Sequence, residues 1–270
     1  LASIASDSLE ELLVAWQGLG YYTRARNLHK AFQKLSEQPF FPKDLDQLKE
    51  LPGVGNYTAK AVAAIAFDQP VVPVDGNVIR VLARVFGLTQ ALPGLKKYIE
   101  DKAVLLEDNH RPGDFAQSLM DLGSVVCKPR QPVCQNCPVS DFCEARKSRL
   151  ERVLPIKAPK SPKPTRYGIA FLIKNSANQI LLQRRSNKGL LAGMIEVPGT
   201  EWSEHPHILP IKGLLKGKVR HVFTHFHLLL DVYETDMCPE KTEGFWADIC
   251  RLDQYALPTV MKKVLHLLET

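Results

Sequence analysis

Residues 51–59, Leu-Pro-Gly-Val-Gly-Asn-Tyr-Thr-Ala, decide how the first half of this chain folds. Gly53 and Gly55 separate one helix expected to end near Leu51 from a second expected to begin directly after Gly55, because glycine readily adopts the left-handed dihedrals of such a turn. Backbone N–H groups at a helix start bind phosphate, and glycines leave them uncovered. The stretch predicts a helical hairpin whose Gly53, Val54 and Gly55 contact a phosphate backbone, although Gly-x-Gly alone is also typical of an ordinary turn in a helical core.

A second stretch, Val-Asp-Gly-Asn-Val-Ile-Arg-Val at residues 74–81, places Asp75 after an apolar run and before an expected helix. By itself an Asp-Gly pair is typical of a turn or a helix N-cap. The order of the two stretches, followed by four closely spaced cysteines, resembles the helix-hairpin-helix superfamily of DNA glycosylases. The resemblance implies that Asp75 is catalytic and faces the sugar of a flipped-out nucleotide. A fixed carboxylate suits that reaction, because breaking an N-glycosidic bond builds positive charge on the deoxyribose.

Composition sets the limits around these motifs. The chain has 270 residues with ordinary apolar and charged fractions, which is enough for two domains. A formal charge of +6 favours acidic partners such as phosphate backbones. No window approaches the roughly 18 apolar residues of a membrane span, and the N-terminus lacks a signal-peptide pattern. We expect a monomeric protein of the bacterial cytoplasm, associated with the nucleoid and without a membrane partner.

The spacing of apolar residues divides the chain into parts. From Ser8 to about Ala145 they recur every three or four residues, which predicts an all-α domain over residues 1–146. Residues 147–164 are rich in lysine, arginine and proline and predict a basic linker. Residues 165–270 contain short apolar runs and a final helix near Pro258 to Leu268, which predicts an α/β or α+β domain. The expected strands cover residues 167–173, 180–183, 219–223 and 226–233.

Four cysteines fall within seventeen positions and suggest a metal site rather than disulfides, since no secretory signal is present. They are Cys127, Cys134, Cys137 and Cys143. Four thiolates in one loop can bind zinc or a 4Fe-4S cluster, but zinc modules usually pair two C-x2-C knuckles and only one is present here. The spacing C-x6-C-x2-C-x5-C resembles the 4Fe-4S loop of endonuclease III and MutY.

That resemblance implies a structural 4Fe-4S cofactor, which would hold Lys128 and Arg130 towards phosphate. The two remaining cysteines, Cys238 and Cys250, are interpreted as ordinary half-buried thiols.

Tyr57 distinguishes between branches of the superfamily. Bifunctional members such as endonuclease III carry a lysine at the matching position, which forms a Schiff base with the sugar, and tyrosine cannot form that imine. Tyr57, with Asn77 close to Asp75, resembles the MutY pattern of adenine DNA glycosylases. The resemblance implies a monofunctional base-excision repair enzyme that acts on adenine opposite 8-oxoguanine or guanine in double-stranded DNA. Without it, Tyr57 would be read as a half-buried aromatic of a helix.

Residues 18–28, Gly-Leu-Gly-Tyr-Tyr-Thr-Arg-Ala-Arg-Asn-Leu, match a loop of the same family. The resemblance implies that Tyr21 wedges into the duplex beside 8-oxoguanine and so offsets an unstacking cost of a few kcal/mol per step. Arg24 and Arg26 are candidate phosphate contacts, although two arginines on a helix are more often a solvated surface.

Residues 165–270 resemble the Nudix-like C-terminal domain of the MutY family. Gln-Arg-Arg at 183–185 and the glycine-rich run 189–199 occur in the expected order, while the R-E-x-x-E-E box of Nudix hydrolases is absent from the sequence, so nucleotide hydrolysis is not expected. Phe223 and Thr224 match the family's 8-oxoguanine-reading residues, with threonine in place of the commoner serine. His225 and His227 alternate on a strand without a third ligand and are interpreted as structural or phosphate-facing.

The family's general acid is a glutamate on a helix that would precede residue 1, and no glutamate in this sequence matches its motif. Because the chain opens with leucine directly into a helical pattern, we expect its natural N-terminal segment to be missing. Loss of a general acid costs about 10²–10⁴ in rate. Two alternatives therefore remain open: an endonuclease III-like pyrimidine glycosylase and lyase, and a catalytically impaired fragment that binds lesions.

Overall fold

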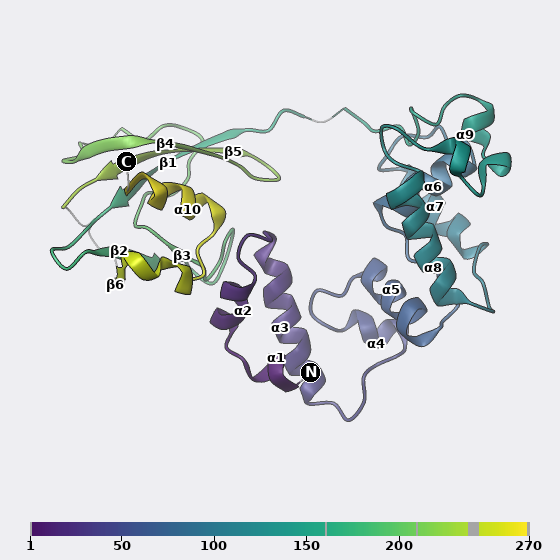
Figure 1. Ribbon diagram of the computed structural model, residues 1–270, viewed down its shortest axis with the longest axis horizontal. Coiled ribbons are helices and arrows are strands. Elements are labelled where there is room, and N and C mark those ends of the chain that lie inside the picture. The colour runs from purple at the N-terminus through teal and green to yellow at the C-terminus, as the bar shows by residue number, and fades with distance from the viewer. Residues whose placement is uncertain (1, 160, 209, 237–242, 269–270) are drawn as a thin grey trace. The chain divides into compact units, whose positions relative to one another are not determined.

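The computed structural model describes residues 2–159, 161–208, 210–236 and 243–268 (Figure 1). It contains two compact units. One consists of Leu1–Glu37 together with Ser161–Thr270, and the other of Gln38–Lys160. The all-α and α/β parts predicted from the sequence are confirmed. The division of the chain nevertheless differs from the predicted domains 1–146 and 165–270, because the first 37 residues pack with the C-terminal part.

The unit Gln38–Lys160 is helical throughout its regular structure. Its helices are α4 (Leu45–Lys49), α5 (Asn56–Phe67), α6 (Gly76–Val85), α7 (Leu95–Val104), α8 (Pro112–Asp121), the π-helix η1 (Leu122–Val126), the 3-10 helices η2 (Cys134–Asn136) and η3 (Ser140–Phe142), and α9 (Glu144–Lys147). The apolar face of α6 provides Val78 and Leu82 to a core that also contains Leu95, Ile99 and Leu119. This core holds α6, and with it the start of the helix at Asp75, in a fixed place.

The predicted hairpin lies between α4 and α5. Asp44 caps α4 by accepting the backbone N–H groups of Asp46 and Gln47, which satisfies donors that would otherwise be orphaned. Gly53 adopts φ +79° in the turn, a conformation that strains residues with a Cβ. Because α5 begins at Asn56, the hairpin predicted from the two glycines is confirmed.

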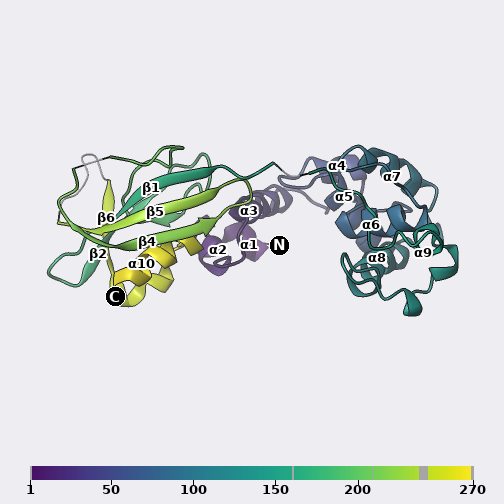
Figure 2. The same cartoon turned by 90° about the horizontal axis from the view of Figure 1, so that it is seen from above.

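The other unit contains two three-stranded sheets (Figures 1 and 2). Its strands are β1 (Thr165–Leu172), β2 (Gln179–Arg184), β3 (Ile195–Glu196), β4 (Leu214–Val222), β5 (His227–Glu234) and β6 (Gly244–Asp248). The first sheet has the order β1-β5-β4, with β1 parallel and β4 antiparallel to β5. The second has the order β3-β2-β6 and is antiparallel. Tyr167 pairs with Leu229 and Leu181 with Trp246.

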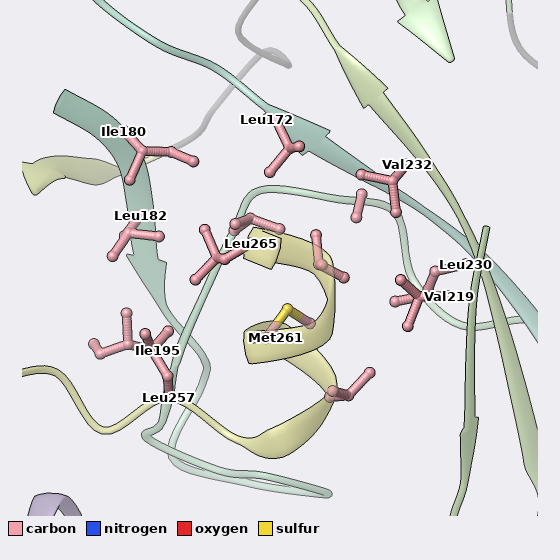
Figure 3. Close-up of a cluster of buried hydrophobic side chains, with 14 of the residues drawn as sticks. Leu172, Ile180, Leu182, Ile195, Val219, Leu230, Val232, Leu257, Met261 and Leu265 are labelled. Carbon is pink, nitrogen blue, oxygen red and sulfur yellow. The ribbon is translucent and has the colours of Figure 1, made fainter. Parts of the chain in front are cut away.

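Helix α10 (Thr259–Leu265) lies between the two sheets and fills their shared core (Figure 3). Met261 and Leu265 of this helix belong to one buried cluster with Leu182 and Ile180 of β2 and with the β1, β4 and β5 side chains that the figure labels. Burial of each large aliphatic side chain stabilises the fold by about 1.5–3 kcal/mol. The final helix predicted near Pro258 to Leu268 is confirmed, with the 3-10 helix η5 (His266–Leu268) at its end.

Three helices at the start of the chain complete this unit: α1 (Ala2–Ser6), α2 (Leu9–Ala15) and α3 (Tyr22–Ser36). Ser8 and Glu11 form a capping box that starts α2. Leu13, Tyr22 and Ala25 are buried against Met194 and Ala256, which are distant in sequence. This apolar cluster explains why the first 37 residues belong to the same unit as the strands.

The segment predicted as a basic linker does not stay free of the helical unit along its whole length. Leu154 is only 2% exposed, and its carbonyl accepts a hydrogen bond from Arg84. Leu92 donates its backbone N–H to Ile156. The first half of the segment thus packs on α6 and its neighbours. Across the residues that the structure describes, no helix is long and apolar enough to cross a membrane.

Candidate functional site

Asp75 occupies the N-cap of α6, where its carboxylate is held by three N–H donors. Oδ1 accepts the backbone N–H groups of Asn77 at 2.8 Å and Val78 at 2.7 Å, and Oδ2 accepts the side-chain amide of Asn77 at 3.2 Å. The positive end of the helix dipole also favours negative charge here. The same geometry would serve an ordinary N-cap, but the amide of Asn77 adds a side-chain contact that fixes the carboxylate plane.

A chain of hydrogen bonds continues from Asp75 to the cysteine loop. Arg80 donates to the Asn77 side-chain oxygen at 2.9 Å, to the carbonyl of Gly123 at 2.6 Å and to the carbonyl of Cys127 at 2.8 Å. Burial is the main cause that lowers the pKa of the Arg80 guanidinium from its usual value. A Cβ on Gly123 would lie 2.6 Å from the Cβ of Asn77, so only glycine allows this close approach.

Tyr57 follows the hairpin as the second residue of α5 and is 42% exposed. Its hydroxyl lies 3.8 Å from the sulfur of Met120. Burial, followed by the negative charge of Asp75, raises the pKa of the Tyr57 phenol. The structure therefore brings the predicted residues Tyr57, Asp75 and Asn77 into one neighbourhood. Within the hairpin, Gly53 and Gly55 are exposed and Val54 is half-buried, so the turn faces solvent.

All four cysteines of the predicted metal loop line one cavity. Its remaining walls are mostly apolar and include Val81, Val85, Leu122, Val126 and Val139. Burial, followed by the charges of Glu151 and the other three cysteines, raises the pKa of the Cys134 thiol. Four thiols gathered in an apolar cavity form a donor set that suits a positively charged metal centre. Lys128 and Arg130 are exposed on the same loop.

Arg84 was not singled out in the sequence, yet its guanidinium holds the start of this loop. Its guanidinium donates to the carbonyls of Cys127, Lys128 and Pro129, to the sulfur of Cys127, and to the carbonyl of Leu154. Arg84 is 1% exposed, so these bonds lie in the interior.

Within the described residues, no three histidine, cysteine, aspartate or glutamate side chains are grouped closely enough to hold a single metal ion.

A second candidate site belongs to the other compact unit. Tyr21, Phe223, Thr224 and His225 line a cleft of about 510 Å³ between the loop before α3 and the turn after β4. Tyr21 is 68% exposed and adopts a left-handed conformation at φ 47°. The structure thus brings together two segments that the sequence separates by about two hundred residues, both predicted to read 8-oxoguanine.

The turn from Phe223 to Phe226 is braced on several sides. Phe223 donates its N–H to the Phe226 carbonyl at 2.9 Å and accepts from Lys163 Nζ at 2.9 Å. Its ring packs against Phe226, His221 and Trp202 at centroid distances of 4.8, 4.6 and 5.6 Å. The ring of Phe223 is therefore half-buried as an anchor of the turn, whereas Thr224 and His225 are exposed at its tip.

Arg24 and Arg26, near the start of α3, differ in their exposure and in their hydrogen bonding. Arg24 is exposed, as a phosphate contact would be. The Arg26 guanidinium instead donates to the carbonyl of Ala192 and to the side-chain oxygen of Asn187 within the same unit. It serves a protein contact in this structure rather than a free phosphate-binding surface, and the sequence carried no signal of this.

Two further sequence interpretations concern single residues. Cys250 is exposed, so its interpretation as a half-buried thiol was wrong; Cys238 lies outside the described residues. His227 is half-buried, and its Nδ1 has no hydrogen-bond partner.

Comparison with known proteins matches both parts of the chain. Residues 1–105 match the HhH-GPD superfamily of base excision DNA repair proteins, and residues 169–267 match the NUDIX domain. The "Adenine DNA glycosylase" of Rattus norvegicus is 33% identical over 100% of this chain and 66% of its own length. The "Adenine DNA glycosylase" of Homo sapiens is 32% identical over 98% of this chain and 61% of its own length. That of Buchnera aphidicola subsp. Schizaphis graminum is 28% identical over 99% and 82% respectively.

The chain therefore spans slightly less than two thirds of the length of the mammalian relatives it matches. Among solved structures, an endonuclease III in a non-covalent DNA complex is 29% identical, with a TM-score of 0.47 over 55% of this chain and 70% of that chain.

Proposed function

The chain belongs to the family of adenine DNA glycosylases, with HhH-GPD and NUDIX parts, and from this premise we propose that it excises adenine mispaired with 8-oxoguanine or guanine from double-stranded DNA. The observation that carries the proposal is the carboxylate of Asp75, held by three N–H donors at the start of α6 and close to Tyr57.

In this reaction the bond between the adenine nitrogen and C1′ of the deoxyribose breaks, and its electron pair leaves with the base. Positive charge develops on the sugar, and the fixed Asp75 carboxylate stabilises it electrostatically. Water then adds to C1′ of the sugar and loses a proton, and the departing adenine takes up a proton, so that the products are free adenine and an abasic sugar. The amide of Asn77 keeps the carboxylate oriented. Tyr57 has no amine for imine formation, which supports hydrolysis without strand cleavage.

We assign DNA binding to the exposed backbone N–H groups of the hairpin and to exposed lysine and arginine side chains. The solvent-facing Gly53, Val54 and Gly55 turn at the start of α5 presents backbone N–H groups to phosphate. Lys128 and Arg130 add positive charge on the cysteine loop, and Arg24 does so beside Tyr21. Such contacts position the duplex without reading its sequence. The target adenine has to leave the base stack before it can reach Asp75.

We assign the cysteine loop to a 4Fe-4S cluster held by Cys127, Cys134, Cys137 and Cys143. Zinc requires four sulfurs about 2.3 Å from one ion, whereas each cysteine of a cluster binds a different iron and the sulfurs stand farther apart. Four cysteines around one cavity support the cluster, because they provide the four thiolates that it requires. A bound cluster would fix the shape of the loop that carries Lys128 and Arg130.

Lesion recognition is assigned to the cleft of the other unit. The exposed ring of Tyr21 is the wedge that enters the duplex beside 8-oxoguanine. The exposed hydroxyl of Thr224 forms the hydrogen bond that distinguishes the oxidised base, and Phe223 supports it as the anchor of the turn.

The test is single-turnover release of adenine from a duplex with one adenine opposite 8-oxoguanine. The native protein is compared with Asp75→Asn, which keeps the side-chain shape and remains a good N-cap. We expect Asp75→Asn to slow release by about 10²–10³-fold. Release at the native rate would refute the role of Asp75.

Two other outcomes favour the alternatives. A covalent protein–DNA adduct trapped in high yield with borohydride would indicate an endonuclease III-like lyase. Tight lesion binding without adenine release, both by this chain and by a version extended to the length of its relatives, would indicate a lesion-binding protein.

A further inference from the structure

A contact between α3 and the loop before β3 joins two of the segments that line the lesion-recognition cleft. Arg26 of α3 donates one N–H to the carbonyl of Ala192 and another to Asn187 Oδ1 at 3.5 Å. The guanidinium lies over Gly193, where a Cβ would come within 2.9 Å of Arg26 Nη2. Gly193 also adopts φ +68°. Glycine is thus required at this position for both its backbone conformation and the space it leaves for Arg26.

The loop that receives Arg26 is itself closed at its base. Gly193 donates its N–H to Ser186 at 2.9 Å, and Arg185 donates its N–H to Met194 at 2.9 Å. Arg184 donates to the Gly193 carbonyl at 3.0 Å and to Glu10 at the start of α2 at 2.8 Å. The loop therefore offers Arg26 a fixed pair of acceptors rather than a mobile surface.

Apolar packing adds to these polar contacts. Leu13, Tyr22 and Ala25 from the first helices are buried with Met194, which directly follows Gly193. Tyr22 and Ala25 flank the two ends of the first turn of α3, and Arg26 comes next along the chain. The first turn of α3 is consequently held on this unit by both buried and hydrogen-bonded contacts.

Tyr21 immediately precedes α3, and the Arg24 N–H bonds to its carbonyl at 2.7 Å. Any shift of the first turn of α3 therefore moves Tyr21. The opposite wall does not move with it, because Thr224 stands on a turn fixed by Lys163 and by the packed ring of Phe223. The spacing between Tyr21 and Thr224 thus depends on how α3 is seated against Ala192 and Gly193.

We propose that Arg26 is a positioning residue for lesion specificity: by seating α3 over Gly193, it sets the separation of Tyr21 and Thr224 and so the preference for 8-oxoguanine over guanine. This inference rests on the proposed function. The two bases differ only at the C8 oxygen and the N7 hydrogen, so discrimination depends on very few hydrogen bonds. Such a site requires its groups to be placed within about 0.5 Å.

The competing role for Arg26 is a direct contact with DNA phosphate, and Arg24 provides a matched control two residues away on the same helix. We compare Arg26→Met and Arg26→Lys with Arg24→Met. Each protein is assayed for adenine release opposite 8-oxoguanine and opposite guanine, and for binding to both duplexes carrying an uncleavable adenine analogue over a range of salt concentrations.

We expect Arg26→Met to lower the 8-oxoguanine-to-guanine ratio, in rate and in binding, by about tenfold or more. The slope of log affinity against log salt should stay at its native value. Arg26→Lys keeps the charge but cannot reach both acceptors in the same way, so it should also lose preference. Arg24→Met should weaken binding to both duplexes alike and reduce the salt slope by about 1, with its preference intact.

The proposal is overturned if Arg26→Met keeps the native ratio, and above all if it also reduces the salt slope by about 1, because Arg26 would then be a phosphate contact. Melting curves of the variants identify any global unfolding, and Arg26→Lys serves as the second variant if Arg26→Met does not fold. If the native protein prefers 8-oxoguanine in binding but releases no adenine, the proposed function fails, while the binding ratios still decide the role of Arg26. A native protein without any preference overturns the proposal.

Discussion

Replacement of Gly123 by alanine tests whether the close approach of η1 to α6 controls the Asp75 carboxylate, which we propose to be catalytic. The added Cβ would lie 2.6 Å from the Cβ of Asn77 and 3.1 Å from its Cα and its carbonyl oxygen. Two of these three contacts are with backbone, so a side-chain rotation cannot relieve them. Forcing a methyl group into such a site costs about 1–3 kcal/mol of stability.

Displacement of Asn77 should also change the hydrogen bonding of the Asp75 carboxylate. The side-chain amide of Asn77 donates to Asp75 Oδ2, and its side-chain oxygen accepts a hydrogen bond from Arg80. Displacement of this side chain therefore removes at least one of the three donors to the carboxylate. A hydrogen bond to a charged group contributes about 1.5–3 kcal/mol. If that orientation is lost in the transition state, Gly123→Ala should slow adenine release by about 10–100-fold, since each 1.36 kcal/mol is tenfold in rate.

Gly76→Ala provides the control, because Gly76 lies beside Asp75 yet a Cβ there meets nothing within 4 Å. Its φ is not in the left-handed region, so alanine should be neutral or stabilise the start of α6 by about 0.4–1 kcal/mol. Thermal melting and single-turnover adenine release are measured for both variants. If Gly123→Ala melts and reacts like the native protein while Gly76→Ala does the same, neither the packing constraint nor the dependence of Asp75 on Asn77 is correct.

The remaining predictions concern a buried cation and a half-buried imidazole. Arg84→Met should leave the carbonyls of Lys128, Pro129 and Leu154 without the donor that Arg84 provides, and should lower the iron bound per chain if the loop holds the proposed cluster. Arg84→Lys should be intermediate, and iron equal to that of the native protein in Arg84→Met would contradict the role of Arg84 in the loop. Burial, followed by the charge of Lys263, lowers the pKa of His221, so the unfolded chain takes up a proton before the folded one as pH falls. Stability should therefore decline as pH falls through the unfolded value near 6.5, and His221→Gln should show a shallower decline in melting temperature between about pH 7 and 5.

Local sequence signals predicted the helical hairpin and the position of Asp75. Gly53 and Gly55 mark a turn whose requirements are met within a few residues, and Asp75 precedes its helix directly. In contrast, β3 and β6 were not predicted. Strand β3 has only two residues. Both β3 and β6 pair with β2: a loop separates β3 from β2 along the chain, and more than fifty residues separate β6 from β2. A short strand defined by a distant partner carries too few residues for an alternating pattern to be recognised.

Sequence patterns do not identify packing partners that are distant along the chain, and for this reason the unit formed by the two ends of the chain was not predicted. Residues 1–105 match one family as a continuous segment, yet the first 37 pack with Ser161–Thr270. Leu13 and Tyr22 have helical spacing that predicts a buried face but does not identify Met194 and Ala256 as what covers it. Likewise Arg26 was interpreted as a candidate phosphate contact or a solvated surface residue. An arginine on a helix does not reveal that it contacts a glycine 167 positions later in the chain.

The residues proposed for chemistry and those proposed for lesion recognition belong to different compact units, which makes their effects separable. Asp75 and Gly123 lie in Gln38–Lys160, whereas Tyr21, Arg26 and Thr224 lie in the other unit. A perturbation of the carboxylate should slow adenine release opposite 8-oxoguanine and opposite guanine by the same factor, because the departing base and the sugar are identical in both mispairs. A perturbation of the α3 seat should change the ratio of the two rates. Combining Gly123→Ala with Arg26→Met should therefore give free-energy changes that add within about 0.5 kcal/mol, as expected for sites without shared partners. Strong non-additivity would show that recognition of the lesion and orientation of Asp75 are energetically coupled.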